Sequence, residues 1–276
     1  MKKTYETYEV LSNEEISKDI FELLVSYKNN KKVIRPGMFV SIVPPNKSNI
    51  LPRPISICEY DEEKEILRLI YKKIGSGTES ISNVLKGEFL KIIAPLGNGF
   101  PSMSHGKQTV IIGGGIGVAP LLELAKRIST TGIRPKIYLG FRNESQVILI
   151  DEFKKYGDVT VIFDPENPVE KLRWDFPNSN LGQSLTEKFN ENIGEISDGR
   201  KILPDTIYTC GPYPLMKAVS NYANEIGIDK FCYASLEERM ACTIGACLAC
   251  VCKTKDGYKT VCTDGPVFAV RDIVWD

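Results

Sequence analysis

The chain has 276 residues, of which 35 are Lys or Arg and 35 are Asp or Glu, so its formal net charge at pH 7 is zero. This length suffices for two domains, and the ordinary apolar and charged fractions indicate a soluble globular protein. There is no long basic run and no stretch of about 18 apolar residues, which argues against a nucleic-acid-binding or membrane-spanning protein. The opening MKKTYETYEV has no apolar signal region, which favours a cytoplasmic location.

Short strand-like runs separated by Pro- and Gly-rich turns, such as PLGNG at 95–99, fill the first hundred residues. Only residues 79–85 have a helical pattern there. The predicted strands are 3–10, 20–26, 38–43, 55–59, 67–72 and 89–93. Short strands with frequent turns predict an antiparallel barrel.

After residue 105 strands alternate with helices. The predicted strands are 109–112, 136–141, 159–163 and 206–209, and the predicted helices are 120–129, 150–156, 184–192 and 215–226. This alternation predicts a doubly wound parallel sheet whose ligands lie at the carboxyl ends of the strands. Between strand and helix, residues 164–182 are polar and rich in Asn and Pro, and we expect a long surface loop.

A glycine run, Gly113, Gly114, Gly115, Ile116 and Gly117, follows the first of these strands. It leads to Pro120, which suits the first turn of a helix. Glycines permit close backbone approach, and the free N–H groups of a helix start attract a pyrophosphate. The spacing is not G-x-G-x-x-G, and glycine turns of this kind also serve close packing of strand and helix.

Two motifs in the barrel region also suit phosphate or flavin. Arg53, Pro54, Ile55 and Ser56 place a bidentate cation close to a hydroxyl that could bond a flavin ring edge. The stretch 75–78 (GSGT) precedes the short helix, where backbone N–H groups could hold phosphate oxygens. The alternatives are a surface arginine beside an edge-strand proline and an ordinary turn into a helix.

Cys210, Gly211 and Pro212 close the last clear strand of the α/β region. A thiol and a glycine at that strand end would face the crevice where a nicotinamide binds. The alternative is a small buried cysteine at the end of a strand.

Near the C-terminus Cys242, Cys247, Cys250 and Cys262 have the spacing C-x4-C-x2-C followed by a fourth cysteine after eleven residues. This spacing is that of plant-type [2Fe–2S] ligation and indicates electron transfer. The small residues between the ligands let backbone N–H groups approach the cluster sulfurs.

Two other interpretations of the cysteines remain open. A structural zinc site usually has C-x2-C pairs or a histidine partner, and the only histidine, His105, is far upstream. A disulfide framework is typical of small secreted chains. Three further cysteines, Cys58, Cys232 and Cys252, are most simply small core residues.

The order of these motifs resembles the ferredoxin-reductase superfamily and, within it, the electron transfer subunits of dihydroorotate dehydrogenase type B. The resemblance covers nearly the whole chain and is most specific in 236–250 and 261–268. It implies a β barrel plus α/β architecture: an FAD-binding barrel at 1–102, an NAD-binding parallel-sheet domain at 103–230 and a [2Fe–2S] module at 231–276.

The resemblance also implies the site residues, with Ser56 and Cys210 closest to the chemistry. The FAD-binding residues would be Arg53, Pro54, Ile55, Ser56, Ile70, Tyr71, Lys72, Gly77 and Thr78. The NAD-binding residues would be Gly113, Gly114, Gly115, Ile116, Gly117, Pro120, Cys210, Gly211 and Pro212. The metal ligands would be Cys242, Cys247, Cys250 and Cys262.

Two features depart from the family. The longer, proline-bearing stretch 164–182 replaces a short acidic loop, although Asp164 is compatible with a ribose 2′-hydroxyl and so with NAD over NADP. Some relatives stack a tyrosine on the flavin, but this chain has Ile55 at the corresponding position. We therefore expect the Tyr71 ring to make that contact.

The resemblance implies an oxidoreductase subunit in which FAD stands between hydride chemistry at NAD and single-electron chemistry at the cluster. The expected partner is an FMN-containing dihydroorotate dehydrogenase catalytic subunit, in a heterotetramer of two subunits of each kind, acting in pyrimidine synthesis. Two alternatives remain: a subunit of another flavin oxidoreductase, of the NAD(P)H:ferredoxin transhydrogenase or sulfide dehydrogenase type, and a non-enzymatic iron–sulfur or zinc module.

Overall fold

The computed structural model describes residues 5–28, 33–101, 106–163, 196–197, 200–201 and 203–275. Contacts divide the chain into two compact units, Met1–Phe100 with Glu237–Val267, and Pro101–Leu236 with Phe268–Asp276. The cysteine-rich segment thus belongs to the same unit as the first hundred residues. The division at 102 and 230 into three domains stays a prediction.

The first unit contains a closed barrel with strand order β1-β2-β5-β4-β3-β6, and its neighbouring strands pair antiparallel. Alternate side chains, among them Leu23, Ile42 and Leu69, point into one buried apolar core. The predicted antiparallel barrel is confirmed. Its strands are β1 (Glu6–Ser17), β2 (Ile20–Ser26), β3 (Phe39–Ile42), β4 (Arg53–Asp61), β5 (Ile66–Lys72) and β6 (Phe89–Leu96).

Two element boundaries in the barrel differ from the sequence prediction. Helix α1 (Ser76–Ser82) begins earlier than residue 79, because Thr78 caps its first turn with hydrogen bonds that a helical periodicity does not reveal. Strand β4 begins at Arg53 instead of residue 55, since Arg53 pairs with Ile42 of β3. The whole RPIS motif therefore lies on a barrel strand.

The cysteine-rich segment forms an irregular loop followed by a hairpin of β14 (Val251–Thr254) and β15 (Gly257–Thr260). Asn98, just after β6, joins it to the barrel. The Asn98 N–H donates to the carbonyl of Gly265 at 2.7 Å, and its side-chain amide donates to the carbonyl of Asp264 at 2.5 Å. The segment is thus fastened to the barrel on the side of its fourth cysteine.

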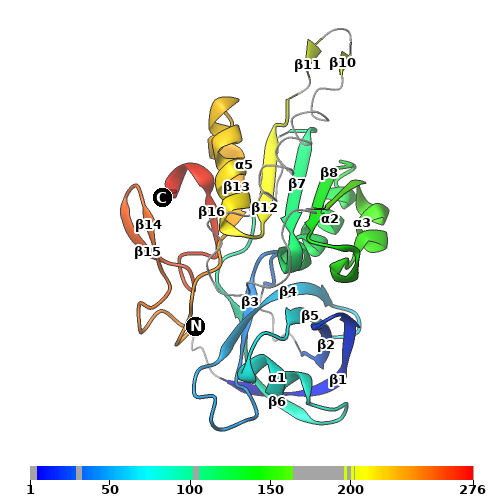
Figure 1. The fold of residues 1–276 in the computed structure, drawn as a ribbon, viewed down its shortest axis with the longest axis vertical. Helices are drawn as coiled ribbons and strands as arrows, with labels where there is room; N and C mark the ends of the chain where they lie inside the picture. The colour runs from blue at the N-terminus through cyan, green and yellow to red at the C-terminus, as the bar shows by residue number, and fades with distance from the viewer. Residues whose placement is uncertain are drawn as a thin grey trace. The chain divides into compact units, whose positions relative to one another are not determined.

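The second unit contains a six-stranded sheet of order β16-β13-β12-β7-β8-β9, parallel from β13 through β9. The predicted parallel sheet is confirmed, although β13 and β16 were not predicted. In Figure 1, α2 and α3 lie together near β7 and β8, whereas α5 lies beside β12 and β13. The strands are β7 (Thr109–Gly114), β8 (Lys136–Phe141), β9 (Asp158–Phe163), β12 (Thr206–Cys210), β13 (Cys232–Ser235) and β16 (Val267–Ala269).

The helices of this unit are α2 (Ala119–Thr130), α3 (Ile150–Tyr156) and α5 (Tyr213–Glu225). Short 3-10 turns are η1 (Gly115–Val118), η2 (Glu144–Gln146), η3 (Asp229–Phe231) and η4 (Val270–Asp272), and β10 (Ile196–Ser197) pairs with β11 (Arg200–Lys201). The predicted helix 184–192, the loop 164–182 with Asp164, and His105 lie outside the described residues.

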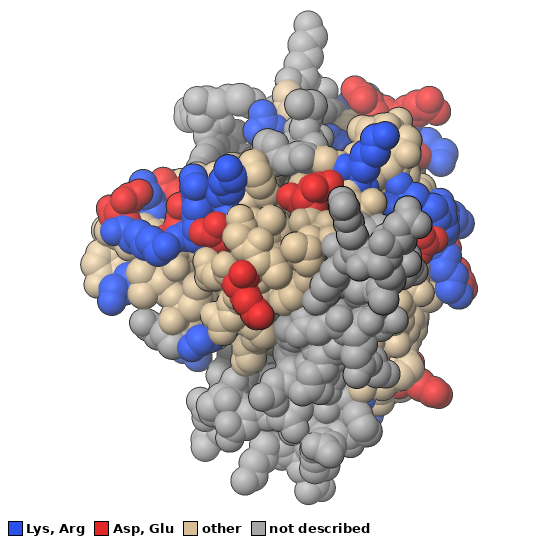
Figure 2. Space-filling view, turned by 90° about the horizontal axis from the view of Figure 1, so that it is seen from above, with Lys and Arg blue, Asp and Glu red and all other residues tan. Residues whose placement is uncertain are grey.

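Figure 2 shows acidic and basic side chains interspersed over the described part of one face, with no stripe of one sign. A basic stripe would be the usual footprint of a nucleic-acid-binding surface. None of the described helices is long and apolar enough to cross a membrane.

Candidate functional site

Arg53 of β4 lies against the backbone of Gly77 in the first turn of α1. A Cβ at position 77 would overlap the guanidinium group, so the Arg53 side chain can lie here only because residue 77 is glycine. The Arg53 Nη1 also donates to the carbonyl of Leu51 at 2.7 Å, which holds the side chain. The fold therefore brings two separately predicted motifs together as a guanidinium over a helix start, a pairing suited to phosphate oxygens.

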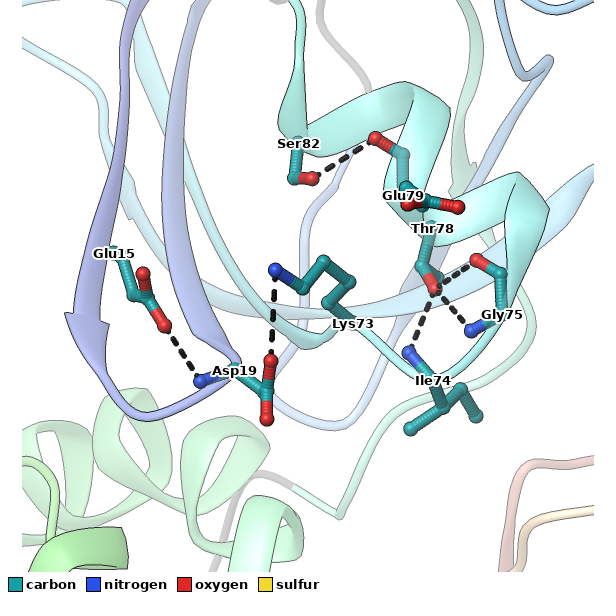
Figure 3. A network of polar contacts seen from close by, with 8 residues as sticks. All are labelled: Glu15, Asp19, Lys73, Ile74, Gly75, Thr78, Glu79 and Ser82. Atoms are coloured by element: carbon teal, nitrogen blue, oxygen red, sulfur yellow. Dashed lines mark hydrogen bonds and ion pairs between the residues drawn. The ribbon is translucent and has the colours of Figure 1, made fainter.

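Thr78 organises the backbone beneath that guanidinium. Its Oγ1 accepts hydrogen bonds from the N–H of Ile74 at 3.0 Å and of Gly75 at 3.3 Å, and donates to the carbonyl of Gly75 at 3.0 Å (Figure 3). At the other end of α1, the Asn13 amide donates to the carbonyl of Ile81 at 2.8 Å. The Thr78 hydroxyl is thus engaged in shaping the turn.

Asn49, in the loop between β3 and β4, adds an unpaired donor beside α1. Its Oδ1 accepts a hydrogen bond from Ser76 Oγ at 2.8 Å, while its buried Nδ2 has no partner among the described residues. A buried amide without a partner is costly, so this N–H group is available to a ligand that accepts a hydrogen bond. The Arg53 guanidinium, the open space at Gly75 and this amide suit the phosphates of FAD. Nothing in the sequence around Asn49 distinguished it from other loop residues.

Ser56 and the stretch 70–72 lie on neighbouring barrel strands, β4 and β5. Ser56 is half-buried, whereas Ile55 and Ile70 are buried. This places the Ser56 hydroxyl where a ligand can reach it, as the proposed flavin contact requires. The FAD-binding assignments of Pro54, Ile55, Ser56, Ile70 and Lys72 stay predictions.

The Tyr71 ring does not occupy the position expected of a flavin-stacking residue. It is 3 % exposed and belongs to the barrel core. It stacks on Phe21 with ring centroids 5.7 Å apart, and its hydroxyl donates to Asn13 Oδ1 at 3.0 Å. The alternation of β5 turns this side chain inward, so the expected ring contact is wrong and only the Tyr71 backbone is left for a cofactor.

In the second unit the glycine run and the CGP motif lie side by side. Cys210 at the end of β12 is in register with Gly113 of β7. A Cβ on Gly117 would come within 2.8 Å of the Cys210 carbonyl oxygen and of the Gly211 backbone, and one on Gly114 within 2.9 Å of Pro212. Two backbones approach at the carboxyl ends of parallel strands, as expected for a dinucleotide site.

The turn after β7 presents backbone groups ahead of a helix. Gly115 has φ +56° with open space around its Cα, and Pro120 stands in the first turn of α2. Cys210 itself is 1 % exposed, so its thiol is buried at the predicted strand end. The NAD-binding roles of Gly113 to Gly117, Pro120 and Cys210 to Pro212, and the catalytic roles of Cys210 and Ser56, stay predictions.

The cysteine loop has a backbone that L-residues seldom adopt. Thr243, Gly245 and Leu248 have φ of 61°, 89° and 58°. For a β-branched residue such as Thr243 this conformation is strained, and strain of this kind clusters at functional sites. Three left-handed residues within six positions make the loop change direction repeatedly.

These turns aim N–H groups at the cysteine sulfurs. The amides of Ala246 and Cys247 donate to Cys242 Sγ at 3.2 and 3.3 Å. Burial raises the pKa of Cys242, but hydrogen bonds from the N–H groups of Ile244, Cys247 and Ala246 and from the Cys247 thiol outweigh it and bring the pKa down to about 6. Cys242 is therefore prepared as a thiolate, the form that binds iron.

The four cysteines lie as two pairs. The Cys242 N–H donates to Cys247 Sγ at 3.4 Å, and the Cys262 N–H donates to Cys250 Sγ at 3.4 Å. Burial and the adjacent Cys250 thiol raise the pKa of Cys262 to about 12, so an incoming metal must displace that proton.

Among the described residues, no three His, Cys, Asp or Glu side chains gather closely enough to hold one ion. Two pairs of thiols suit two irons with two cysteines each better than one tetrahedral zinc. The remaining cysteines Cys58, Cys232 and Cys252 are buried, as predicted.

Comparison with known proteins places this geometry in a family. The family model "Iron-sulfur cluster binding domain of dihydroorotate dehydrogenase B" matches residues 237–274. The chain is similar to a "Dihydroorotate dehydrogenase B (NAD(+)), electron transfer subunit" of Fusobacterium nucleatum, with 37% identity over 96% of each chain. The protein of the same name from a Geobacillus strain is 36% identical, again over 96% of each chain.

Solved structures share the fold. An NADH-dependent reduced ferredoxin-NADP oxidoreductase structure aligns with a TM-score of 0.79 and 25% identity, covering 98% of this chain and 90% of that one. Phthalate dioxygenase reductase aligns with a TM-score of 0.63 and 17% identity, covering 91% and 87%.

Proposed function

Because the chain belongs to the family of electron transfer subunits of dihydroorotate dehydrogenase B (NAD(+)), we propose that it passes electrons from a separate FMN-containing catalytic subunit to NAD⁺. One observation carries this proposal. The cysteine loop, with N–H groups aimed at Cys242 Sγ, lies in the same compact unit as Arg53 and Gly77, the residues that we propose hold the FAD phosphates.

The cofactors divide the work by their chemistry. FAD, when bound, exchanges a hydride with NAD and single electrons with a [2Fe–2S] cluster, and neither of the other two groups can do both. Oxidation of dihydroorotate in the catalytic subunit would supply the electrons. This order places the chain in pyrimidine synthesis, where it would act only as part of a complex.

The chain's own residues supply binding and orientation. Arg53 and the α1 start would hold the FAD phosphates, the Ser56 hydroxyl would bond the flavin edge, and the turns at Gly113 and Gly211 would admit the NAD backbone. Cys242, Cys247, Cys250 and Cys262 would ligate the two irons.

The catalytic partner is expected to dock at the cysteine loop. Leu248 is 62% exposed and Ile244 38% exposed, on either side of the exposed Cys247. Apolar side chains around an exposed ligand form a surface from which a partner can exclude water, as at the centre of protein interfaces. We propose two catalytic and two electron transfer subunits in the complex, located in the cytoplasm, where thiols stay reduced.

Co-purification with the catalytic subunit tests the function. The complex should reduce NAD⁺ when given dihydroorotate, and Leu248→Asp should weaken assembly by more than about 1 kcal/mol, as buried interface anchors do. Leu85→Asp is the matched control, because Leu85 is 69% exposed and lies between α1 and β6, outside the cysteine loop. A complex that forms but cannot reduce NAD⁺ with dihydroorotate would refute the assignment.

A second candidate function is that of the structurally similar NADH-dependent reduced ferredoxin-NADP oxidoreductase, with its TM-score of 0.79. An assay with reduced ferredoxin in place of dihydroorotate as the electron donor distinguishes the two functions. A purified protein without flavin or iron–sulfur absorbance would instead support a non-enzymatic module.

A further inference from the structure

Ser41 is a polar residue buried on the outer side of the barrel. Its neighbours Val40 and Ile42 belong to the barrel core, so the alternation of β3 turns Ser41 outward. Ser41 is nevertheless 0 % exposed. The cysteine-rich segment covers it, and its Oγ lies 2.8 Å from Oγ1 of Thr243, which follows the first cysteine ligand.

Thr243 is held at a strained φ of 61° and is 1 % exposed. Glycine or asparagine adopts this conformation with less strain than a β-branched residue. Its hydroxyl offsets that cost, because Oγ1 donates to the carbonyl of Cys242 at 2.6 Å besides its contact with Ser41. A hydrogen bond between two buried hydroxyls defines one seating of the loop, whereas apolar contact alone tolerates sliding.

Ser41 also stands next to the predicted flavin segment. In the register of β3 and β4, Ser41 pairs with Pro54, inside the motif Arg53 to Ser56. The chain of contacts therefore runs from Cys242 through Thr243 and Ser41 to the strand that carries Arg53. It contains one side-chain hydrogen bond and one strand pairing.

We propose that the Ser41–Thr243 hydroxyl pair is a positioning contact that seats the cluster loop against β3 and thereby sets the rate of electron passage between flavin and cluster. The inference rests on the proposed function. With NADH as reductant, bound FAD would accept a hydride and release NAD⁺. It would pass one electron to a ferric iron of the cluster held by Cys242, Cys247, Cys250 and Cys262 and keep the second for a further acceptor.

The test is anaerobic rapid mixing of the full, cofactor-loaded chain with NADH, following flavin and cluster bleaching separately. In Ser41→Ala and Thr243→Gly, cluster bleaching should slow about 10- to 100-fold, the usual effect of losing an outer-shell contact. Flavin bleaching, iron and sulfide content and the EPR spectrum of the reduced cluster should stay those of the unaltered chain. Thr243→Ser should restore the rate, because it keeps the hydroxyl.

Thr254→Val is the matched control. Thr254 is 6% exposed in the same segment, and its hydroxyl donates to the carbonyl of Gly257 at 2.8 Å, within its own hairpin. Its loss should leave the bleaching rate unchanged.

Unaltered cluster bleaching in Ser41→Ala would overturn the inference, as would loss of the cluster from that variant, which would make the contact one of cluster retention. If Thr243→Gly loses its cluster and Ser41→Ala keeps it, the rate of cluster bleaching in Ser41→Ala decides whether the inference holds. If NADH bleaches the flavin but never the cluster of the unaltered chain, the proposed function fails instead.

Discussion

In the barrel unit the candidate sites depend on side chains that hydrogen bonds hold in place, whereas in the parallel-sheet unit the candidate site depends on glycines, which have no side chain. Arg53, Thr78 and Asn49 each have a partner that fixes them. By contrast Gly114 and Gly117 touch a neighbouring backbone or ring directly. The first kind of site should fail when an atom is removed, and the second when an atom is added.

The largest effect is expected from Cys247→Ser. Serine lacks the soft thiolate that iron requires, so the cluster should be lost and electron transfer between the two subunits should stop, while NADH-to-dye activity through FAD persists. Iron analysis and EPR measure the loss of the cluster, and dye reduction measures the activity that persists. Cys252→Ser should spare the cluster. Loss of dye reduction with FAD still bound would contradict the proposed electron order.

Gly117→Ala should disrupt the glycine-dependent site of the parallel-sheet unit. The new Cβ would lie 2.8 Å from the Cys210 carbonyl oxygen, so backbone must shift, at about 1–3 kcal/mol of unfolding free energy. Calorimetry and the KM for NADH should both report the change. Gly227→Asn is its control, because Gly227 has φ +75° with open space, a conformation that asparagine tolerates. Equal stability of the two variants would show that close packing at Gly117 is unimportant.

Arg53→Lys tests the first kind of site by keeping charge and removing the guanidinium fork. FAD affinity should fall roughly tenfold, since lysine cannot make the paired bonds to phosphate oxygens. Fluorescence titration of the apoprotein with FAD measures this. Arg68→Lys is the comparison, because Arg68 on β5 instead bonds Glu22 at 2.7 Å. Unchanged FAD affinity in Arg53→Lys would remove Arg53 from the site.

The smallest effect is a difference in labelling within the cysteine loop. In the metal-free protein, the pKa of Cys242 near 6 makes it a thiolate at pH 7, whereas the pKa of Cys262 near 12 keeps that thiol protonated. Iodoacetamide should therefore label Cys242 before Cys262, and the Cys242 rate should fall as pH drops below about 6. Mass spectrometry after timed quenching measures the labelling rates of both cysteines. Equal rates at pH 7 would mean that the N–H groups do not hold the loop once iron is gone.

Local pattern was enough to predict much of this molecule. The barrel strands, the strand–glycine–helix alternation and the cysteine spacing are all short-range features, because side-chain periodicity and ligand spacing are properties of neighbouring residues. Strand β2, strand β8 and helix α3 have the predicted bounds. Strands β13 and β16 escaped prediction because four and three residues carry too little periodic signal.

Only the tertiary structure decided which distant residues meet. The expected role of the Tyr71 ring failed because strand alternation, set by barrel closure, turned it onto Phe21. Arg53 over Gly77, the unpaired Asn49 amide and the Ser41–Thr243 pair join residues from separate elements. The sequence by itself determined which chemistry the chain can carry, since residue types and spacing define ligands. Packing alone decided where those ligands stand, because long-range contacts depend on the closure of the whole barrel and not on any one segment.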